Sequence, residues 1–308
     1  FKSSTDTYKR GLFNAALLLV LEKYEQITET VLPTLGKERQ KTYSPFLPVC
    51  PETGQILEVP VIEIKKKEGK IIYQNGDQKT ETEIDCIRHA VKIAETALTN
   101  TLSNVSAGIT EEEIASELTI QLMREGSGHE LPFFPIVSSG PSAADPHAFP
   151  TNKILEPGEI LLIDWGASNQ AFFSDITRVF HVPGKEVDER LMEAFNSVKE
   201  ANRVGRDFAK PGVLAQDIDR KVRKVITDSG FGDFFIHRTG HGLGVEVHEP
   251  PYINEGDETI LKEGMVFTIE PGIYLPDLGG IRIEDDVLIT KDGSESLTTL
   301  SRDLCPLS

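Results

Sequence analysis

The stretch His237-Arg-Thr-Gly-His241-Gly-Leu-Gly-Val-Glu-Val-His248-Glu249 carries three of the chain's seven histidines within twelve positions. Glycines flank the middle histidine, and glycine permits positive φ angles and close backbone approach. This pattern predicts that His241 is presented on a tight loop rather than inside a helix. Two prolines follow Glu249, so the stretch is not the His-Glu-x-x-His helix of zinc proteases. Taken alone, the stretch is equally compatible with a glycine-rich turn that holds incidental histidines.

Four strand-like segments elsewhere carry an acid where an apolar side chain is expected. They are Ile160–Gly166 with Asp164, Ala171–Phe180 with Asp175, Met265–Gly272 with Glu270, and Gly280–Val287 with Glu284. Asp164 and Asp175 are predicted on the two arms of a hairpin that turns at Ser168-Asn169. Two-residue alternation places Arg282 and Glu284 on one face of the last segment.

These four acids together predict a metal site. An ionised carboxylate among apolar side chains is costly unless it is paired or metal-bound, and several together raise one another's pKa. Protonation can relieve one acid, and Arg178 or Arg282 can pair with one or two. Two divalent cations would balance the four negative charges, and His241 would add a nitrogen ligand. Oxygen-rich ligation with a single imidazole favours a hard ion such as Mn²⁺ over a structural zinc.

Length and composition limit the class of protein. A chain of 308 residues forms one large domain or two ordinary ones. No apolar run of about 18 residues is present, so no membrane span is expected. The net charge of −17 argues against a nucleic-acid partner, because a phosphate backbone requires a basic face. The three scattered cysteines, Cys50, Cys86 and Cys305, exclude a disulfide framework and indicate a reducing compartment such as the cytoplasm.

The charge divides the chain near residue 80. Residues 1–79 hold 12 Lys+Arg and 10 Asp+Glu, so subtracting this +2 from the net −17 leaves −19 for the remainder. Residues 7–31 are predicted to form an amphipathic helix, and Gln55–Ile64 with Lys70–Gln74 a β-hairpin. The segment 1–79 is therefore predicted to be a small helix-plus-hairpin domain without recognisable chemistry, and 80–308 a separate catalytic domain.

The remainder of the chain shows an internal repeat. A helix is predicted over 81–101, followed by a second helix that Thr110 and Glu113 begin with a capping box. A longer helix over 188–208 again precedes a second helix. The aligned positions are Gly108-Ile109, Ile114, Leu118, Leu122 and Gly126 in one copy, and Gly212-Val213, Ile218, Val222, Ile226 and Gly230 in the other. Two copies of one α/β unit are thus predicted, although any two amphipathic helices can align in this way.

Residues 80–308 resemble the pita-bread metallopeptidases, and among them the Xaa-Pro branch of prolidases and aminopeptidase P. The motifs that carry the resemblance are Asp164-Trp-Gly, Ser174-Asp175-Ile-Thr-Arg, His237–Glu249, Thr268-Ile-Glu270-Pro-Gly-Ile-Tyr274 and Gly280-Ile-Arg282-Ile-Glu284-Asp. Methionine aminopeptidases share the ligands, but they carry a longer segment between the two glutamates and usually Met after Glu-Pro. The resemblance implies an α+β pita-bread fold of two pseudo-symmetric α/β halves.

The resemblance also implies a ligand set for two divalent metal ions. Asp175 and Glu284 would bridge the ions, and Asp164 would bind one of them. His241 and Glu270 would bind the other. Mn²⁺ is the expected ion, with Co²⁺ or Zn²⁺ as alternatives. The implied activity is metal-dependent hydrolysis of the Xaa-Pro bond at the N-terminus of peptides or in dipeptides.

Four further residues match active-site positions of the family that are not ligands, namely His147, His237, His248 and Arg282. Taken alone, His147 is an ordinary loop histidine between prolines; the resemblance makes it a substrate contact. His147 and His237 would hold the proline end of the substrate, and His248 would stabilise the oxyanion. Glu270, besides binding metal, would accept and relay a proton.

Other functions remain open on the same fold. Some pita-bread proteins have lost the metal and act as binding modules, but they usually lose ligands, and none is missing here. Creatinase-like C–N hydrolases act on this fold without a metal. Members of the Xaa-Pro branch normally carry an N-terminal α/β domain that helps to build a homodimer and close the substrate site, and residues 1–79 do not resemble that domain.

Residues 1–79 resemble a different family. Tyr8–Asp77, centred on Tyr43-Ser-Pro-Phe-Leu-Pro-Val-Cys50-Pro-Glu-Thr-Gly54, is similar to an internal stretch of class I lysyl-tRNA synthetases of the bacterial type. The stretch lacks the nucleotide-binding motifs of that family. The resemblance therefore implies no aminoacylation.

Overall fold

The computed structural model describes residues 23–31, 33, 61–65, 70–73, 81–103, 105–128 and 131–307. The chain divides into two compact units, Phe1–Gly76 and Asp77–Ser308, and each is described by itself. Among the described residues, no helix combines the length and the apolar character that a membrane crossing requires.

The described residues of the first unit include one helix and one hairpin. Helix α3 (Tyr24–Val31) is the end of the helix predicted over 7–31, whose earlier part lies outside the described residues. Strands β1 (Val61–Lys65) and β2 (Lys70–Tyr73) pair antiparallel, which confirms the predicted hairpin. Residues 55–60 and 74 of the predicted strands lie outside the described part.

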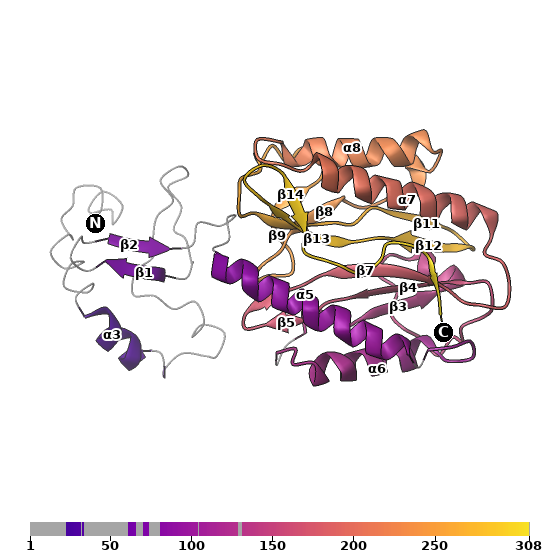
Figure 1. The fold of residues 1–308 in the computed structure, drawn as a ribbon, viewed down its shortest axis with the longest axis horizontal. Helices are drawn as coiled ribbons and strands as arrows, with labels where there is room; N and C mark the ends of the chain where they lie inside the picture. The colour runs from indigo at the N-terminus through magenta and orange to yellow at the C-terminus, as the bar shows by residue number, and fades with distance from the viewer. Residues whose placement is uncertain are drawn as a thin grey trace, which may run out of the picture. The chain divides into compact units, whose positions relative to one another are not determined.

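The second unit is built from paired helices and short strands (Figure 1). The helices are α5 (Glu81–Leu102), α6 (Glu111–Arg124), α7 (Glu189–Phe208) and α8 (Ala215–Asp228), with short 3-10 turns η3 (Gly140–Ala144) and η4 (Gly232–Phe234). The strands of the first half are β3 (Ile136–Ser139), β4 (Ile160–Trp165), β5 (Ser168–Asn169), β6 (Phe172–Phe173) and β7 (Ile176–His181). Those that follow are β8 (Gly240–Gly242), β9 (Glu249–Ile253), β10 (Val266–Ile269), β11 (Gly272–Leu275), β12 (Gly279–Arg282), β13 (Asp285–Ile289), β14 (Ser294–Ser296) and β15 (Cys305–Pro306).

Two main sheets lie between the two pairs of helices. One sheet has the strand order β14-β13-β10-β8-β9 and the other the order β15-β7-β4-β3. An isolated bridge between Thr177 and Glu284 joins them. Figure 1 shows α7 and α8 on one side of the strands and α5 and α6 on the other. The junction of the two sheets is therefore covered by helices on both sides.

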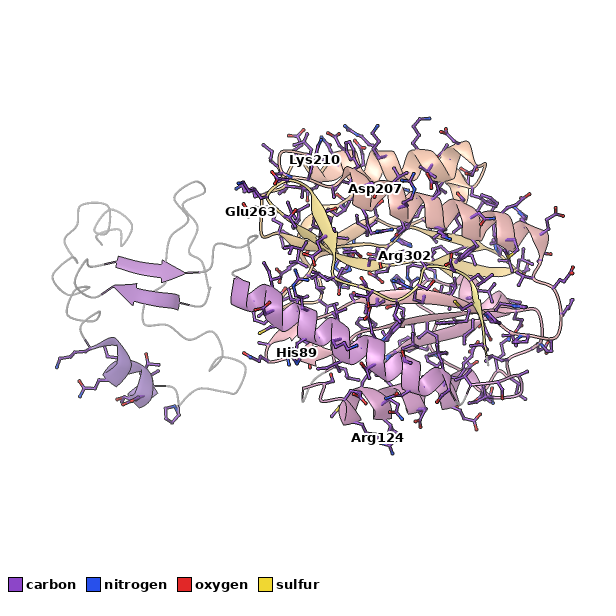
Figure 2. The ribbon with its side chains drawn as sticks, in the orientation of Figure 1. His89, Arg124, Asp207, Lys210, Glu263 and Arg302 are labelled. Atoms are coloured by element: carbon purple, nitrogen blue, oxygen red, sulfur yellow. The ribbon has the colours of Figure 1, made fainter. Side chains whose placement is uncertain are left out.

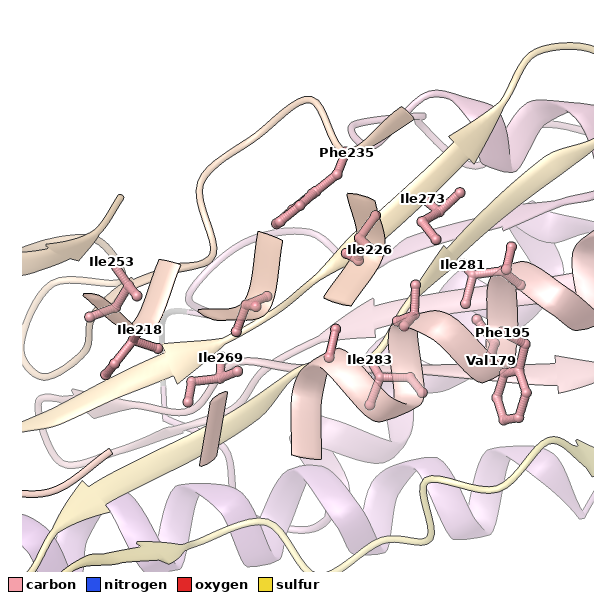
Figure 3. Packing of buried hydrophobic residues seen from close by; sticks show 14 of the residues in the cluster. Val179, Phe195, Ile218, Ile226, Phe235, Ile253, Ile269, Ile273, Ile281 and Ile283 are labelled. Carbon is pink, nitrogen blue, oxygen red and sulfur yellow. The ribbon is translucent and has the colours of Figure 1, made fainter. Parts of the chain in front are cut away.

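The second helix of each half packs an apolar face onto the strands. The fully buried residues of these faces are Ile114, Leu118 and Leu122 in α6 and Ile218, Val222 and Ile226 in α8. The α6 face belongs to one apolar core and the α8 face to another. Figure 3 shows the core of α8 from close by. Burial of each such side chain contributes about 1.5–3 kcal/mol to stability. The three- and four-residue spacing that predicted these helices is thus the spacing of their buried faces.

The predicted repeat is confirmed in the backbone. Gly108 and Gly126 flank α6 with φ angles of +97° and +94°, and Gly212 and Gly230 flank α8 with φ angles of +88° and +82°. A residue with a Cβ atom rarely adopts this conformation, so both copies require glycine at the same two places. Agreement in conformation as well as in spacing argues against a chance alignment of two helices.

The helix starts show where the copies have diverged. Thr110 accepts a hydrogen bond from Glu113 N at 3.2 Å, and Glu113 Oε2 accepts one from Thr110 N at 2.9 Å. The predicted capping box is therefore confirmed for α6. Leu214 holds the equivalent position before α8, where no side chain caps the helix.

The predicted turn of the hairpin between Asp164 and Asp175 is wrong. Ser168-Asn169 form β5 and pair with Phe172–Phe173 of β6, so the chain turns at Gln170-Ala171. Gln170 has a φ angle of +56°, which fits a tight two-residue turn. The paired arms themselves are as predicted, because β4 and β7 pair antiparallel over six residues.

The prediction that His241 lies on a tight loop is also wrong. His241 is the central residue of strand β8, which pairs with β9 on one side and β10 on the other. A Cβ atom on Gly240 would lie 1.9 Å from the Thr268 carbonyl oxygen, and one on Gly242 would lie 2.3 Å from that of Pro250. The two glycines therefore serve close backbone approach, with no positive φ angle at either.

Candidate metal centre

All nine site residues predicted from the sequence line one pocket of about 700 Å³. They are His147, Asp164, Asp175, His237, His241, His248, Glu270, Arg282 and Glu284. The pocket opens where the two sheets meet, since strands of both contribute to its wall. Folding thus brings together residues that are up to 137 positions apart, from 147 to 284 in the sequence.

The five candidate ligands form two overlapping groups. Ligand atoms of Asp164, Asp175 and Glu284 lie within 4.8 Å of one another, and so do those of His241, Glu270 and Glu284. Glu284 belongs to both groups and lies at their junction. His248 forms a further group with Asp175 and His241 at the same distance limit. This arrangement offers two adjacent cation positions that share a carboxylate, as a dinuclear site requires.

Breaks between strands direct most of these acids into the pocket. Asp175 lies between β6 and β7, Glu270 between β10 and β11, and Glu284 between β12 and β13. Asp164 is the exception, because it lies within β4 and pairs with Thr177 of β7. At a break the side chain leaves the regular alternation of a strand, so an acid can face the pocket without disturbing either ladder.

His241 is oriented as a metal ligand. Its Nδ1 lies 3.1 Å from the Gly242 carbonyl oxygen, which assigns the ring proton to that nitrogen. Its Nε2 lies 3.6 Å from Asp175 Oδ2 and 3.5 Å from Glu270 Oε1. Burial lowers the pKa of His241 to about 3, with a smaller effect from His248. The imidazole is therefore neutral, and its free lone pair points at the acids.

Burial and mutual repulsion dominate the electrostatics of the acids. Burial raises the pKa of Asp175 and of Glu284 well above the usual values, and the neighbouring acids raise them further. Burial also raises the pKa of Glu270 to about 7. Asp164 shows a raised pKa, again from burial, although Arg282 opposes the shift. Four acids at this density need positive charge that one arginine cannot supply.

Arg282 pairs with a candidate ligand, as predicted, whereas Arg178 does not. Arg282 Nη2 lies 2.6 Å from Asp164 Oδ2, and the other oxygen of that carboxylate is buried without a hydrogen-bond partner. Arg178 instead binds Asp285, on the far side of the strand, at 2.7 Å. The prediction that Arg178 could neutralise a ligand is therefore wrong. The unpartnered Asp164 oxygen fits a cation that the residues themselves do not provide.

Two hydroxyl groups organise the pocket although the sequence assigned them no role. Thr177 Oγ1 donates to Glu284 Oε2 at 2.7 Å and accepts from Arg282 Nε at 3.0 Å. Tyr274 accepts a hydrogen bond from Arg282 Nη1 at 2.7 Å. Burial raises the pKa of Tyr274 to about 12, so its hydroxyl stays protonated. Both residues lie inside the quoted motifs, two positions from Asp175 and four from Glu270, and that proximity was the available signal.

His237 lies beside the acids with both ring nitrogens engaged. Its Nδ1 lies 2.7 Å from the Arg238 carbonyl oxygen, and its Nε2 lies 2.8 Å from the Tyr274 hydroxyl. Burial and the positive charge of Arg282 lower the pKa of His237 to about 3. The ring is thus neutral and fixed, with Nδ1 as donor and Nε2 as acceptor of the Tyr274 proton.

The other two histidines of the predicted site, His248 and His147, lie at the pocket wall. The ring of His248 packs edge-on against that of His241, with 4.2 Å between centroids. His147 is exposed on the loop that follows η3. Aromatic side chains of Phe133, Phe134 and Phe149 extend the wall, and Phe149 is 79% exposed. The pocket therefore combines a charged floor with an apolar rim, which suits a ligand that has both polar and apolar parts.

One buried acid holds both ends of the His147 loop. Glu111 Oε1 accepts hydrogen bonds from Ser139 N, Ser139 Oγ and Ser142 Oγ at 2.8, 2.9 and 2.6 Å. Glu111 Oε2 accepts from Thr151 N and Oγ1 at 3.2 and 2.9 Å. The sequence carries no signal of this role, because an acid in the first turn of a helix is common for other reasons.

Two family models match the chain. The model of metallopeptidase family M24 matches residues 85–291, and that of class I tRNA synthetases (K) matches residues 1–94. Both resemblances expected from the sequence are thus confirmed. The M24 match spans two thirds of the chain and includes every candidate site residue.

Relatives and solved structures agree with the first match. The chain is 39% identical to a Xaa-Pro dipeptidase of Pyrococcus furiosus over 286 residues, covering 92% of this chain and 79% of that relative. The X-Pro aminopeptidase of Thermotoga maritima superposes with a TM-score of 0.71 at 40% identity, covering 74% of this chain and 64% of that one. The prolidase of Pyrococcus furiosus superposes with a TM-score of 0.70 at 42% identity, covering 73% and 66%. The predicted pita-bread fold is confirmed, and the chain spans just under two thirds of these solved chains.

Proposed function

The chain belongs to metallopeptidase family M24, and from this premise we propose that it is a dinuclear metal-dependent exopeptidase for peptides with proline second. The observation that carries the proposal is the pair of overlapping ligand groups that share Glu284. The names of its relatives, Xaa-Pro dipeptidase and prolidase, support the substrate class. The reaction is hydrolysis of the bond between the first residue and proline.

The residues that would hold two divalent ions are Asp164, Asp175, His241, Glu270 and Glu284, and Glu284 belongs to both groups of ligand atoms. Bound divalent ions supply Lewis acidity and lower the pKa of water at the site. Four carboxylates and one neutral imidazole form an oxygen-rich set, which favours Mn²⁺ over Co²⁺ or Zn²⁺. The unpartnered Asp164 oxygen and the raised pKa values of the acids fit such ions.

Glu270 is the proposed proton acceptor. Its carboxylate lines the pocket, with Oε1 3.5 Å from His241 Nε2, so it lies where it could accept a proton from a water molecule at the metal site. His248, at the pocket wall, is proposed to donate to the carbonyl oxygen of the scissile bond as negative charge develops there.

The proline end of the substrate is proposed to lie against His147 and His237. His147 is exposed and lines the pocket, where a ligand can reach it. Both ring nitrogens of His237 are engaged, so we propose that it offers its ring face to the proline. Arg282 is proposed to hold Asp164 and, through Thr177, Glu284 in place.

A comparison of three substrates tests the proposal. Ala-Pro, Ala-Pro-Ala and the proline-free Ala-Ala are incubated with the protein, with and without added Mn²⁺. We expect cleavage of one or both proline peptides only with the metal, and little cleavage of Ala-Ala. Equal rates on Ala-Ala would reject proline specificity, and the ratio of the first two rates separates a dipeptidase from an aminopeptidase for longer peptides.

Elemental analysis of the same samples separates the rival functions. Two bound ions per chain are expected for the enzyme proposed here. Activity without bound metal would favour a creatinase-like hydrolase, and absence of both would favour a binding module.

We further propose a homodimer in a reducing compartment such as the cytoplasm; the free thiols of Cys86 and Cys305 support the compartment. Light scattering tests the dimer against the chain mass of 34.1 kDa.

A further inference from the structure

The segment that carries His237 has little regular structure of its own. It runs from the end of η4 to the start of β8, over residues 235–239. Phe235 is buried in the α8 core, as Figure 3 shows, whereas Ile236 is 64% exposed. A histidine on such a segment needs a contact from a rigid element if its ring is to keep one position.

Arg223 of α8 provides that contact. Its Nη1 donates to the Phe235 carbonyl oxygen at 3.0 Å, and its Nη2 donates to the His237 carbonyl oxygen at 3.0 Å. The guanidinium also lies over the Phe235 ring, with 4.2 Å from Cζ to the ring centroid. One side chain therefore holds the two carbonyl groups on either side of Ile236 and the ring next to them.

Asp219, one helical turn earlier, holds Arg223 in this position. Its two carboxylate oxygens accept from Arg223 Nε and Nη2 at 3.1 and 3.0 Å. Asp219 Oδ1 also accepts from the Thr239 hydroxyl at 2.7 Å. Asp219 is 1% exposed, so the charged pair has a fixed geometry rather than that of a mobile surface pair. Helix α8 thus binds the segment at Phe235, His237 and Thr239.

The position of the His237 ring depends on these contacts of Arg223 and Asp219 with residues 235–239. The ring contacts the Phe235 ring edge-on, with 5.2 Å between centroids, and its Nε2 meets the Tyr274 hydroxyl. A shift of the 235–239 backbone would move the ring away from both. Resting on the hydrolysis proposed above, we propose that Arg223, held by Asp219, is a positioning residue that places His237 for the proline end of the substrate. Arg223 itself does not line the pocket.

Arg220 offers a matched control on the same helix. It lies one turn before Arg223 and is also ion-paired, to Glu255 and Asp217. Its side chain is 51% exposed, and none of its hydrogen bonds reaches residues 235–239. A lysine in place of either arginine keeps the charge but lacks the planar, forked set of donors through which Arg223 binds the Asp219 carboxylate and two carbonyl groups.

The kinetic test compares Arg223→Lys with Arg220→Lys, using Ala-Pro and saturating Mn²⁺. We expect Arg223→Lys to lower kcat/KM by about 100-fold, mainly through KM, because a displaced contact to the substrate weakens its positioning. Arg220→Lys is expected to match the unmodified protein. Both variants are expected to bind the same amount of Mn²⁺. Unchanged kinetics in Arg223→Lys, or a loss of bound metal in that variant, would overturn the proposal.

A second readout does not depend on activity. In protein with ¹⁵N-labelled histidine rings, the Nδ1–H signal of His237 is identified by its loss in His237→Gln. We expect this signal to shift or broaden in Arg223→Lys and to stay in place in Arg220→Lys. Asp219→Asn serves as a second variant if Arg223→Lys does not fold, and the same change is expected. An unmoved signal in the folded variants contradicts positioning; a moved signal in a protein that never cleaves Ala-Pro rejects only the proposed hydrolysis.

Discussion

Glu284 and Asp285 are neighbours in the sequence and are both almost fully buried, at 2% and 0% exposure, yet they lie in opposite electrostatic settings. Glu284 faces the pocket, where three other acids surround it and its pKa is raised well above the usual value, chiefly by burial. Asp285 faces the other way, where arginines lower its pKa to about 2 despite its burial.

The arginines around Asp285 come from three parts of the chain. Arg178 lies in β7, Arg206 in α7 and Arg302 in the final segment, and all three approach the same carboxylate within 3.4 Å. In the view of Figure 2, Arg302 lies over the middle of the second unit, whereas Arg124 and Lys210 lie at its edges. Asn202 donates to Asp285 as well, at 3.0 Å.

The difference between the two settings explains why one group of acids is proposed as a metal site and the other is not. Burying a carboxylate is tolerable when the chain supplies its counter-charge, as it does at Asp285. Among the described residues, the one salt bridge from an arginine to the pocket acids is that of Arg282 with Asp164, so these acids favour cations from outside the chain. Replacing an acid should consequently have different effects on the two sides of this strand.

Asp175→Asn is expected to have the largest effect, on the pocket side. Loss of a shared ligand should reduce bound metal and lower kcat/KM. Loss of a residue that only supports a ligand lowers activity by up to about 100-fold, and loss of the ligand itself should lower it more. The metal-free protein should be no less stable than before, because one repelling charge is gone. Metal analysis, Ala-Pro kinetics and thermal unfolding with EDTA measure the three quantities.

The exposed pair of Asp303 and Lys199 provides the control for that change. Asp303→Asn is expected to alter neither metal content nor rate. Full turnover by Asp175→Asn with two ions bound would contradict the assignment of Asp175 as a ligand. A strong loss of stability in the metal-free variant would show that Asp175 is paired within the protein and does not belong with the pocket acids.

Asp285→Asn should act on stability rather than on the chemistry. The amide would leave the guanidinium groups of Arg178 and Arg302 buried without their counter-charge, which typically costs about 3–5 kcal/mol. Urea unfolding at pH 7 measures the loss, and added Mn²⁺ should restore only part of it. A stability within about 1 kcal/mol of the unmodified protein would remove the contrast between the two groups of acids.

The pH dependence of stability separates the two groups within a single protein. The pKa of Glu270 rises from the usual 4.5 to about 7 on folding, so the metal-free folded state binds a proton more tightly than the unfolded state does. This contribution, about 3 kcal/mol, is present below pH 4.5 and is lost as the pH rises through 7. Asp285 contributes the opposite trend, since its pKa falls from 3.8 to about 2 and its stabilisation is lost as the pH falls through that range.

Urea unfolding with EDTA between pH 2 and pH 8 checks both trends. Because burial lowers the pKa values of His237 and His241 to about 3, these two residues make the stability rise between about pH 3 and pH 6.5 and oppose the Glu270 trend. The Glu270 trend is therefore measured as the difference between the unmodified metal-free protein and Glu270→Gln, and bound Mn²⁺ should raise the stability most above pH 7, where protons no longer compete with the metal. Asp285→Asn should reduce the fall on the acid side, to which the two histidines also contribute, and leave the difference due to Glu270 in place. A pH profile of Glu270→Gln that matches that of the unmodified metal-free protein between pH 5 and pH 8 would contradict the raised pKa of Glu270.

The four acids of the pocket were predictable from the sequence as residues that are costly to bury. Asp164, Asp175, Glu270 and Glu284 interrupt apolar segments, and an interruption of that kind needs a compensating charge wherever the chain folds. The paired helices were predictable for a related reason, because their buried faces recur every three or four residues. Both signals are local in the sequence and depend little on the tertiary arrangement.

The contacts that depend on the meeting of distant segments were not predictable in this way. The prediction for Arg178 fails because the sequence does not say which of two adjacent acids, Glu284 or Asp285, it meets. The loop prediction for His241 fails because a glycine can serve either a positive φ angle or close approach, and only the neighbouring strands decide. Thr177 and Tyr274 carry no charge, so their burial leaves no comparable signal in the sequence.

Glu111 extends the comparison to a third kind of buried acid and should give the smallest effect. It is fully buried, and the donors in contact with it are the neutral hydroxyl and amide groups of Ser139, Ser142 and Thr151. Glu111→Gln replaces one acceptor oxygen by an NH₂ group, which would face the donors of Ser139, Ser142 or Thr151. The free energy of unfolding should fall by about 1–3 kcal/mol. The exposed neighbour Glu112 gives the control, Glu112→Gln, for which no loss is expected.

The place where structure is lost distinguishes Glu111 from Asp175 and Asp285. Because Glu111 binds the two ends of the His147 loop, Glu111→Gln should raise the KM for Ala-Pro and speed proteolysis within residues 140–150, while bound Mn²⁺ stays unchanged. Limited proteolysis followed by mass spectrometry locates the cleavage. Loss of stability without faster cleavage in the loop would mean that the contacts of Glu111 stabilise the start of α6 rather than the loop. In that case the positive end of the helix, together with neutral hydroxyl and amide donors, would be enough to stabilise a buried carboxylate without an arginine or a metal ion.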